Sequence, residues 1–223
     1  IDRGKKITVK FISRYLILMT FVFLIWVWNP FIALILFLAY SAWHFGQTDV
    51  NQWGVKSKLI GFLWGCVLLG YLFITHLDEL NTILSALEVP VLMSFQEMDI
   101  LKGLIIGLGV LFSVYFRKFQ WLLVVCFLFC CQFTNLIFSF AIYFILHHSR
   151  LGWLHLKNEL KISHVKMYLR ALPFNIGAVV LFVLFFTNFE LSLKENIAYF
   201  FIFLSCVSFP HVLCMHTFYK KSC

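Results

Sequence analysis

The chain consists of a succession of uncharged apolar stretches, separated by short segments that carry most of its Lys and Arg residues. Several stretches approach the ~20 residues that an α-helix needs to cross a bilayer. Of all residues 62% are hydrophobic and only 13% are charged, whereas apolar residues make up about half of an ordinary soluble domain. A membrane β-barrel would show ~10-residue segments of alternating polarity, and none is present. We therefore predict an all-α, polytopic integral-membrane bundle, with a single domain over residues 1–223.

The apolar pattern predicts eight membrane spans, at about 15–28, 31–47, 59–75, 101–116, 119–132, 134–148, 171–188 and 196–218. Apolar and basic residues mix in segment 151–170, which is typical of a helix lying at the membrane surface. In the fourth span Gly103, Gly107 and Gly109 favour close helix packing. The chain begins at Ile1 without a methionine, and we expect an upstream helix to be missing.

The distribution of basic residues orients these eight spans. Of the 18 Lys and Arg residues, all except Lys102 and Lys194 fall on one side, which leaves 18 − 2 = 16 there. Cytoplasmic loops carry an excess of basic residues, so this side is expected to be the cytoplasmic face of a bacterial inner membrane. The net charge of +8 is thereby explained, so we expect membrane lipid and no nucleic acid as a partner. The sequence does not indicate an oligomeric state.

Three expected spans bring a histidine to the cytoplasmic half of the bundle: His44, His148 and His211. His155 lies seven residues after His148, about two helical turns along the same face. Imidazole is costly in hydrocarbon unless it is paired or bound, and it is a favoured ligand of iron, copper, zinc and nickel. The convergence therefore predicts a metal site.

His147 and Asp49 lie close to these candidates in the sequence. Neighbouring residues on a helix point about 100° apart, so His147 and His148 are not expected to bind one metal equally. Asp49 follows His44 by five residues and is expected to orient a ligating histidine from outside the ligand set. The remaining histidines are expected to be ordinary polar residues at the membrane interfaces: His76, His164 and His216.

Three motifs carry a family resemblance: SAWHFGQTD (41–49), HHSRLGWLHLK (147–157) and FPHVL (209–213). Together they resemble the Brp/Blh family of bacterial and archaeal membrane β-carotene 15,15'-dioxygenases, over most of the chain. The HFG..D pattern is the most specific part of the resemblance. It implies a helical bundle with non-haem Fe(2+) held by histidines, which uses O2 to cleave the central double bond of β-carotene and gives two all-trans-retinal.

By this resemblance His44 and His148 would be iron ligands, and His211 or His155 would complete the set. Tyr143 would border the substrate, and no separate catalytic side chain is implied, because the oxygen chemistry belongs to the metal. Two departures affect the ligand set. The family's earlier HGxxD-type motif is absent from this chain, and Gly152 occupies the position four residues after His148 where many relatives have a second histidine. The resemblance therefore leaves three alternatives for the fourth ligand: an upstream residue, His155 or His147.

Other functions remain open from the residues alone. A di-iron desaturase or hydroxylase would need HxxHH-type spacings, which are absent. A haem-binding subunit could use His44 and His211 as axial ligands on two helices. A transporter or assembly protein would use its histidines without any redox chemistry.

Overall fold

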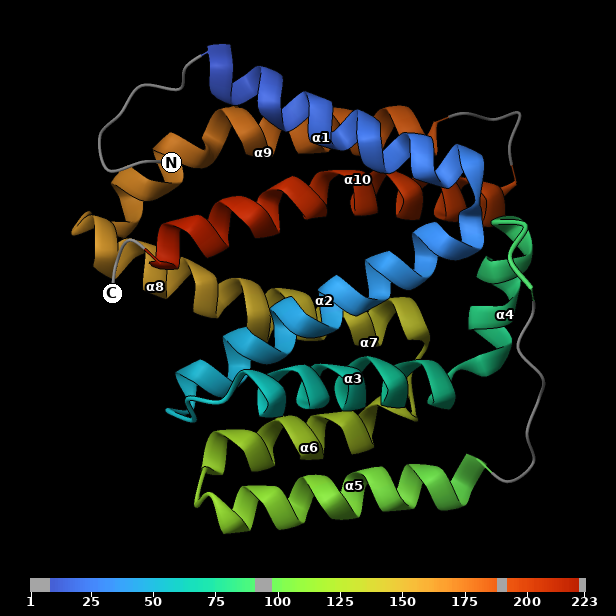
Figure 1. Cartoon of the computed structure of the whole chain (residues 1–223), viewed down its shortest axis with the longest axis vertical. Helices are drawn as coiled ribbons and strands as arrows, with labels where there is room; N and C mark the ends of the chain where they lie inside the picture. The colour runs from blue at the N-terminus through green and yellow to red at the C-terminus, as the bar shows by residue number, and fades with distance from the viewer. Residues whose placement is uncertain (1–8, 91–97, 188–191, 221–223) are drawn as a thin grey trace. The chain divides into compact units, whose positions relative to one another are not determined.

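The computed structural model describes residues 9–90, 98–187 and 192–220, and every regular element in these ranges is a helix (Figure 1). The all-α prediction is confirmed for this part of the chain. The elements, in chain order, are α1 (Val9–Trp28), α2 (Pro30–Gln52), α3 (Lys58–Thr75), α4 (Leu77–Ala86), α5 (Met98–Tyr115), α6 (Phe119–Cys131), α7 (Leu136–Ile142), the π-helix η1 (Tyr143–Ser149), α8 (Arg150–Leu160), α9 (His164–Phe186) and α10 (Leu193–Lys220).

The chain divides into two compact units, and each is described by itself. The first comprises residues 1–37, 83–89 and 151–223, and in it α1 packs against α10. The indole of Trp26 donates to the Ser205 hydroxyl over 2.6 Å, and the Tyr15 hydroxyl donates to the Val207 carbonyl over 2.9 Å. The expectation of one domain over residues 1–223 stays a prediction.

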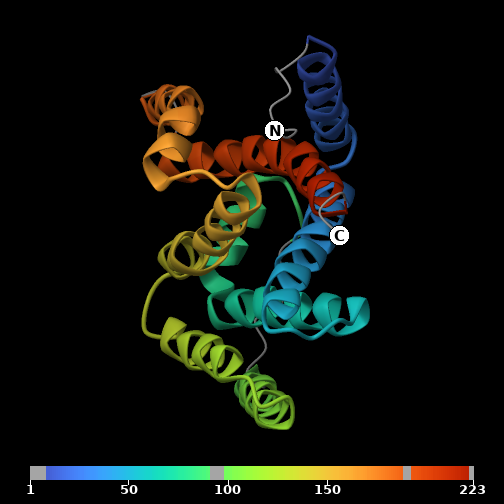
Figure 2. The same ribbon diagram turned by 90° about the vertical axis from the view of Figure 1, so that its left-hand side faces the viewer.

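The second unit comprises residues 38–82 and 90–150 and contains both HFG..D and the two adjacent histidines. Its helices α5 and α6 lie side by side in both views (Figures 1 and 2). Helix α3 contacts α5, α6 and α7, so it is the central element of this unit.

Four of the described helices are long and apolar enough to cross a membrane: α1, α2, α3 and the Lys194–Met215 part of α10. A fifth is added if the two parts of α9, which is bent near Pro173, count as one span. The predicted number of eight is therefore not confirmed. The reason is clear for α6, since its 13 residues reach only about 20 Å against a hydrocarbon core of about 30 Å.

Helix α1 shows why the chain suits a lipid environment. Trp26 is its one buried residue among those described, and apolar side chains such as Val9, Ile17 and Val27 are more than half exposed. A large exposed apolar surface is rare on a soluble monomer. In a bilayer this apolar surface contacts lipid instead of water, so its exposure costs no free energy. The surface of α1 therefore supports the prediction of a membrane protein.

Glycine contacts bring α2 and α3 unusually close. A Cβ at Gly46 would overlap backbone atoms of Gly61 and Gly65, and a Cβ at Gly65 would overlap the carbonyl of Ala42. Small residues permit this approach of two membrane helices. The glycines expected to do so in α5 behave differently. Gly109 meets Val125 of α6, but a Cβ at Gly103 or Gly107 meets nothing within 4 Å, so the expectation was wrong for those two.

Candidate metal centre

Two of the predicted ligands lie together in the second unit. The imidazole of His44, on α2, and that of His148, on η1, have ring centres 5.0 Å apart with an interplanar angle of 74°. His148 is buried and His44 is half-buried. The two histidines come from the two motifs that carry the most specific parts of the family resemblance.

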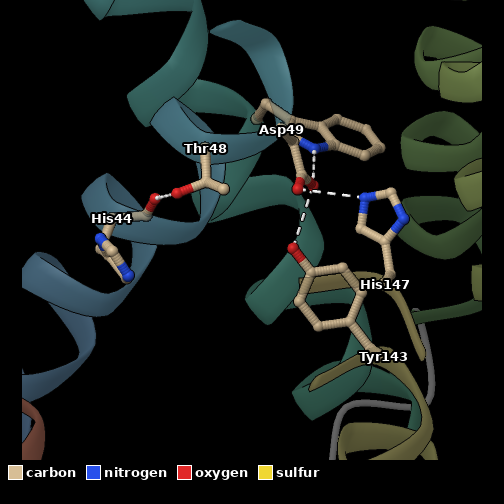
Figure 3. Close-up of polar contacts among 6 residues, drawn as sticks. His44, Thr48, Asp49, Tyr143 and His147 are labelled. Atoms are coloured by element: carbon tan, nitrogen blue, oxygen red, sulfur yellow. Dashed lines mark hydrogen bonds and ion pairs between the residues drawn. The ribbon is translucent and has the colours of Figure 1, made fainter. Parts of the chain in front are cut away.

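Asp49 forms a separate hydrogen-bonded cluster on the other side of α2 (Figure 3). Its carboxylate is fully buried, with an exposed fraction of 0%. The Tyr143 hydroxyl donates to Oδ2 over 2.9 Å, and the indole N–H of Trp64 donates to the same oxygen over 3.1 Å. Nε2 of His147 lies 3.1 Å from Oδ1. We call these four residues the Asp49 cluster.

Asp49 lies inside α2, although the sequence predicted that this span ends at Gln47. The polar residues after Gln47 are typical of a loop, yet the helix continues to Gln52. The partners of Asp49 explain the extension, because a buried carboxylate is tolerated when donors surround it. Figure 3 shows the His44 side chain directed away from this carboxylate, so the histidine that Asp49 contacts is His147.

The π-helical geometry of η1 sorts its side chains into two pairs. Tyr143 and His147 both reach Asp49, while Phe144 stacks on His148 with ring centres 5.7 Å apart. The wider turn of a π-helix, which is frequent at functional sites, aligns residues four apart more closely than an α-helix does. His147 and His148 therefore contact different residues, and the expectation that they do not bind one metal equally stays a prediction.

Phenylalanine side chains form an apolar wall beside His148. The ring of Phe45, the residue after His44, lies 4.6 Å from that of His148, centre to centre. Phe45 also contacts Phe140 and Phe144, which stack on each other. The positions of the HFG..D motif therefore have distinct physical roles, since His44 faces His148, Phe45 supports it, Gly46 lets α3 approach and Asp49 holds η1.

The other two predicted ligands belong to the first unit. His155 is an exposed residue of α8, and His211 follows Pro210 in α10. Within the described ranges 9–90, 98–187 and 192–220, no three His, Cys, Asp or Glu side chains are grouped so that they could hold a metal ion. The structure therefore brings His44 and His148 together, and a ligand role for His155 or His211 stays a prediction.

The three remaining histidines were expected at membrane interfaces. His76 is instead buried, with Nδ1 2.8 Å from the Leu72 carbonyl and Nε2 close to the carbonyls of Cys131 and Thr134. His164 is exposed and accepts a hydrogen bond from the Trp153 indole. The side chain of His216 lies outside the described part of the structure.

Sequence reasoning did not find Trp64 or the role of His147. The sequence did contain a pattern that could have placed Trp64 at a helix contact. Gly61 and Gly65 lie on either side of it, at the four-residue spacing that is typical of close helix packing. No pattern in the sequence pairs His147 with Asp49, since they lie on helices far apart in the chain.

The residues present fit one half of a histidine-bound iron site. With bonds of about 2 Å between nitrogen and metal, two imidazoles on one ion hold their ring centres about 5 Å apart, and His44 and His148 have this separation. Imidazole is a favoured ligand of iron. Two ligands from two helices are compatible with such a site, which further donors would complete.

A comparison with protein-family models gives a match over almost the whole chain. A family model described as Beta-carotene 15,15'-dioxygenase matches residues 2–219. The chain belongs to this family. No curated protein and no solved structure matches the chain. The description of the family names a dioxygenase that acts on β-carotene, which implies a carotenoid and O2 as substrates.

Proposed function

We propose that the protein uses O2 to cleave the central double bond of β-carotene, giving two molecules of all-trans-retinal. The observation that carries the proposal is the pair His44–His148, which lies in a chain matched over residues 2–219 by the β-carotene 15,15'-dioxygenase family model. The protein would act as an integral protein of the bacterial inner membrane, with its basic loops in the cytoplasm.

His44 and His148 would hold a non-haem Fe(2+) ion, with His155, His211 or an upstream residue completing the ligand set. When bound, iron supplies the activation of O2 for cleavage of the alkene. The chain's own contribution is to present two imidazoles from different helices and to surround one of them with aromatic side chains.

The wall formed by Phe45, Phe140 and Phe144 suits a polyene. The rings of Phe45 and Phe144 adjoin His148, and Phe140 packs against both of these rings, so a hydrocarbon chain that lies against the wall comes close to the proposed metal. Burial of apolar surface contributes about 25 cal/mol per Å², which favours a long apolar substrate. Tyr143, which was expected to border the substrate, is fully buried and donates to Asp49, so we assign it to the Asp49 cluster.

The family match favours this function over its rivals. A desaturase or hydroxylase, a haem-binding subunit and a transporter would each leave a match to the β-carotene 15,15'-dioxygenase family without explanation. No observation on the described residues favours any of the three.

The test is expression of the complete gene in a bacterium that accumulates β-carotene. We expect loss of the yellow colour and formation of retinal, and we expect neither with His44→Ala or His148→Ala. His164→Ala is the matched control, because this exposed histidine lies on α9, outside the unit that holds the pair. Unchanged β-carotene in cells whose membranes contain the wild-type protein would contradict the proposal.

A further inference from the structure

The position of the Asp49 carboxylate is energetically unfavourable for a charged group. It is fully buried on a helix long and apolar enough to cross a membrane, where an ionised side chain is expensive unless it is paired. Three donors from two other helices surround it: Trp64 on α3, and Tyr143 and His147 on η1. Replacing a whole buried polar network by apolar side chains is often neutral or stabilising, so stability alone does not require a carboxylate at this position.

Two of these donors fix the rotation of η1 about its axis. Tyr143 and His147 are four residues apart and reach the same carboxylate, one at each oxygen. A helix held at two points on one side cannot rotate without breaking a hydrogen bond. The direction in which the next residue, His148, leaves the helix is set by the same constraint.

The third donor fixes the carboxylate itself. Trp64 lies between Gly61 and Gly65, the residues at which α3 meets the backbone of α2. The position of its indole relative to Asp49 is therefore set by a close contact between helix backbones. As a result, α2, α3 and η1 meet at a single side chain, on the other side of α2 from His44.

We propose that Asp49 is a positioning residue for His148. Through Tyr143 and His147 it orients the π-helix so that the His148 imidazole faces His44. His147 then holds the helix without binding the metal. The HFG..D motif would therefore have two roles, because His44 is one ligand and Asp49 orients the second ligand, His148. The inference rests on the proposed function, in which His148 binds the metal.

The contacts of His147 and His148 support different roles for these two residues. His147 has a hydrogen-bond partner at 3.1 Å that competes for its Nε2 atom, whereas His148 packs against the rings of Phe45 and Phe144 and faces His44. Groups that orient ligands in this way typically change metal affinity by about 10- to 100-fold when they are removed.

The test is titration of the purified, metal-free protein with Co(II), whose visible absorption reports the geometry of its ligands. For Asp49→Asn we expect affinity to fall by about 10-fold or more, with a changed spectrum. Tyr143→Phe should weaken binding in the wild-type background but have no further effect in Asp49→Asn. A purely structural role would lower the melting temperature and leave the affinity and spectrum of the folded protein unchanged.

Two substitutions of His147 separate a holding role from a ligand role. In His147→Gln an amide N–H can replace the imidazole donor, so Co(II) affinity should stay close to that of the wild type. In His147→Leu no donor remains, and affinity should fall as in Asp49→Asn. Equal loss in both variants would identify His147 as a ligand and overturn the inference.

Different experimental results would contradict the positioning role of Asp49 and the proposed function. If wild-type protein binds Co(II) and Asp49→Asn binds it equally well with the same spectrum, the positioning role is wrong and the iron site stands. If folded wild-type protein binds neither Co(II) nor Fe(II), both the iron site and the positioning role are overturned.

Discussion

The imidazole rings of His44 and His148 lie 5.0 Å apart, centre to centre, although they come from α2 and from the π-helix η1. Helix α2 is set against α3 by glycine contacts, and η1 is held by the Asp49 cluster. The relation between the two histidines therefore depends on contacts made elsewhere on α2 and η1.

The two histidines should behave as one functional unit. We expect His44→Ala and His148→Ala each to lower the rate of retinal formation by more than about 100-fold, and the double variant to be no worse than either single one, because effects within a catalytic unit are not additive. The measurement is retinal formed by purified protein with added Fe(II). A double variant slower than the single variants by the product of their effects would show that the histidines act independently.

The contact between α2 and α3 can be tested within α3. Gly65→Ala places a methyl group on the Ala42 carbonyl, whereas Gly70→Ala meets nothing within 4 Å. We expect Gly65→Ala to lower the free energy of unfolding by about 1–3 kcal/mol, measured as a lower melting temperature in detergent. Gly70→Ala should be neutral or stabilising by about 0.5–1 kcal/mol, because alanine is more favourable than glycine inside a helix. Equal melting temperatures would contradict the close contact.

His76 should matter for stability and not for metal binding. It lies at the end of α3, and its ring contacts backbone carbonyls from α3 and from the turn after α6. His76→Ala removes the hydrogen bonds of the ring to these buried carbonyls, and each such bond contributes about 0.5–1.5 kcal/mol. We expect a lower melting temperature with Co(II) affinity of the folded protein unchanged. Loss of Co(II) binding in folded His76→Ala would place this histidine in the metal site.

Substitution of Phe144 should change substrate binding more than it changes the stability of the fold. Its ring stacks on His148 and is 38% exposed, so its removal opens little of the core. For Phe144→Ala we expect KM for β-carotene to rise several-fold with a melting temperature close to that of the wild type. Phe45→Ala is the contrasting variant, because that buried ring supports the core and its loss costs about 3–5 kcal/mol. An unchanged KM in Phe144→Ala would remove this residue from the substrate path.

The sequence predicted that the described part of the chain is helical and that His44 and His148 lie near each other, because hydropathy and charge act over whole segments. The bounds of α3 differ by one residue from those expected, and His44 and His148 were expected at one level. The network of Asp49 could not be predicted, since it depends on the rotation of two helices about their axes. Hydropathy does not encode that rotation, nor the change from α7 to the π-helix at Tyr143.

The predicted number of membrane spans is not confirmed, for a physical reason. An apolar stretch such as Phe119–Cys131 forms a helix too short to cross a membrane core. The polarity of such a segment can be read from its residues, but not whether it crosses, enters or packs within the protein. The positions of His155 and His211 depend on the arrangement of the two units, which local patterns do not contain.

Central cleavage at the His44–His148 site is tested most directly by the ratio of retinal formed to β-carotene consumed. The measurement uses purified protein supplied with Fe(II) and O2. We expect two molecules of all-trans-retinal for each β-carotene, and none with His44→Ala. One aldehyde longer than retinal, accompanied by one carbonyl product shorter than retinal, would contradict central cleavage. Unconsumed β-carotene in the presence of folded, iron-loaded protein would contradict the proposed function as a whole.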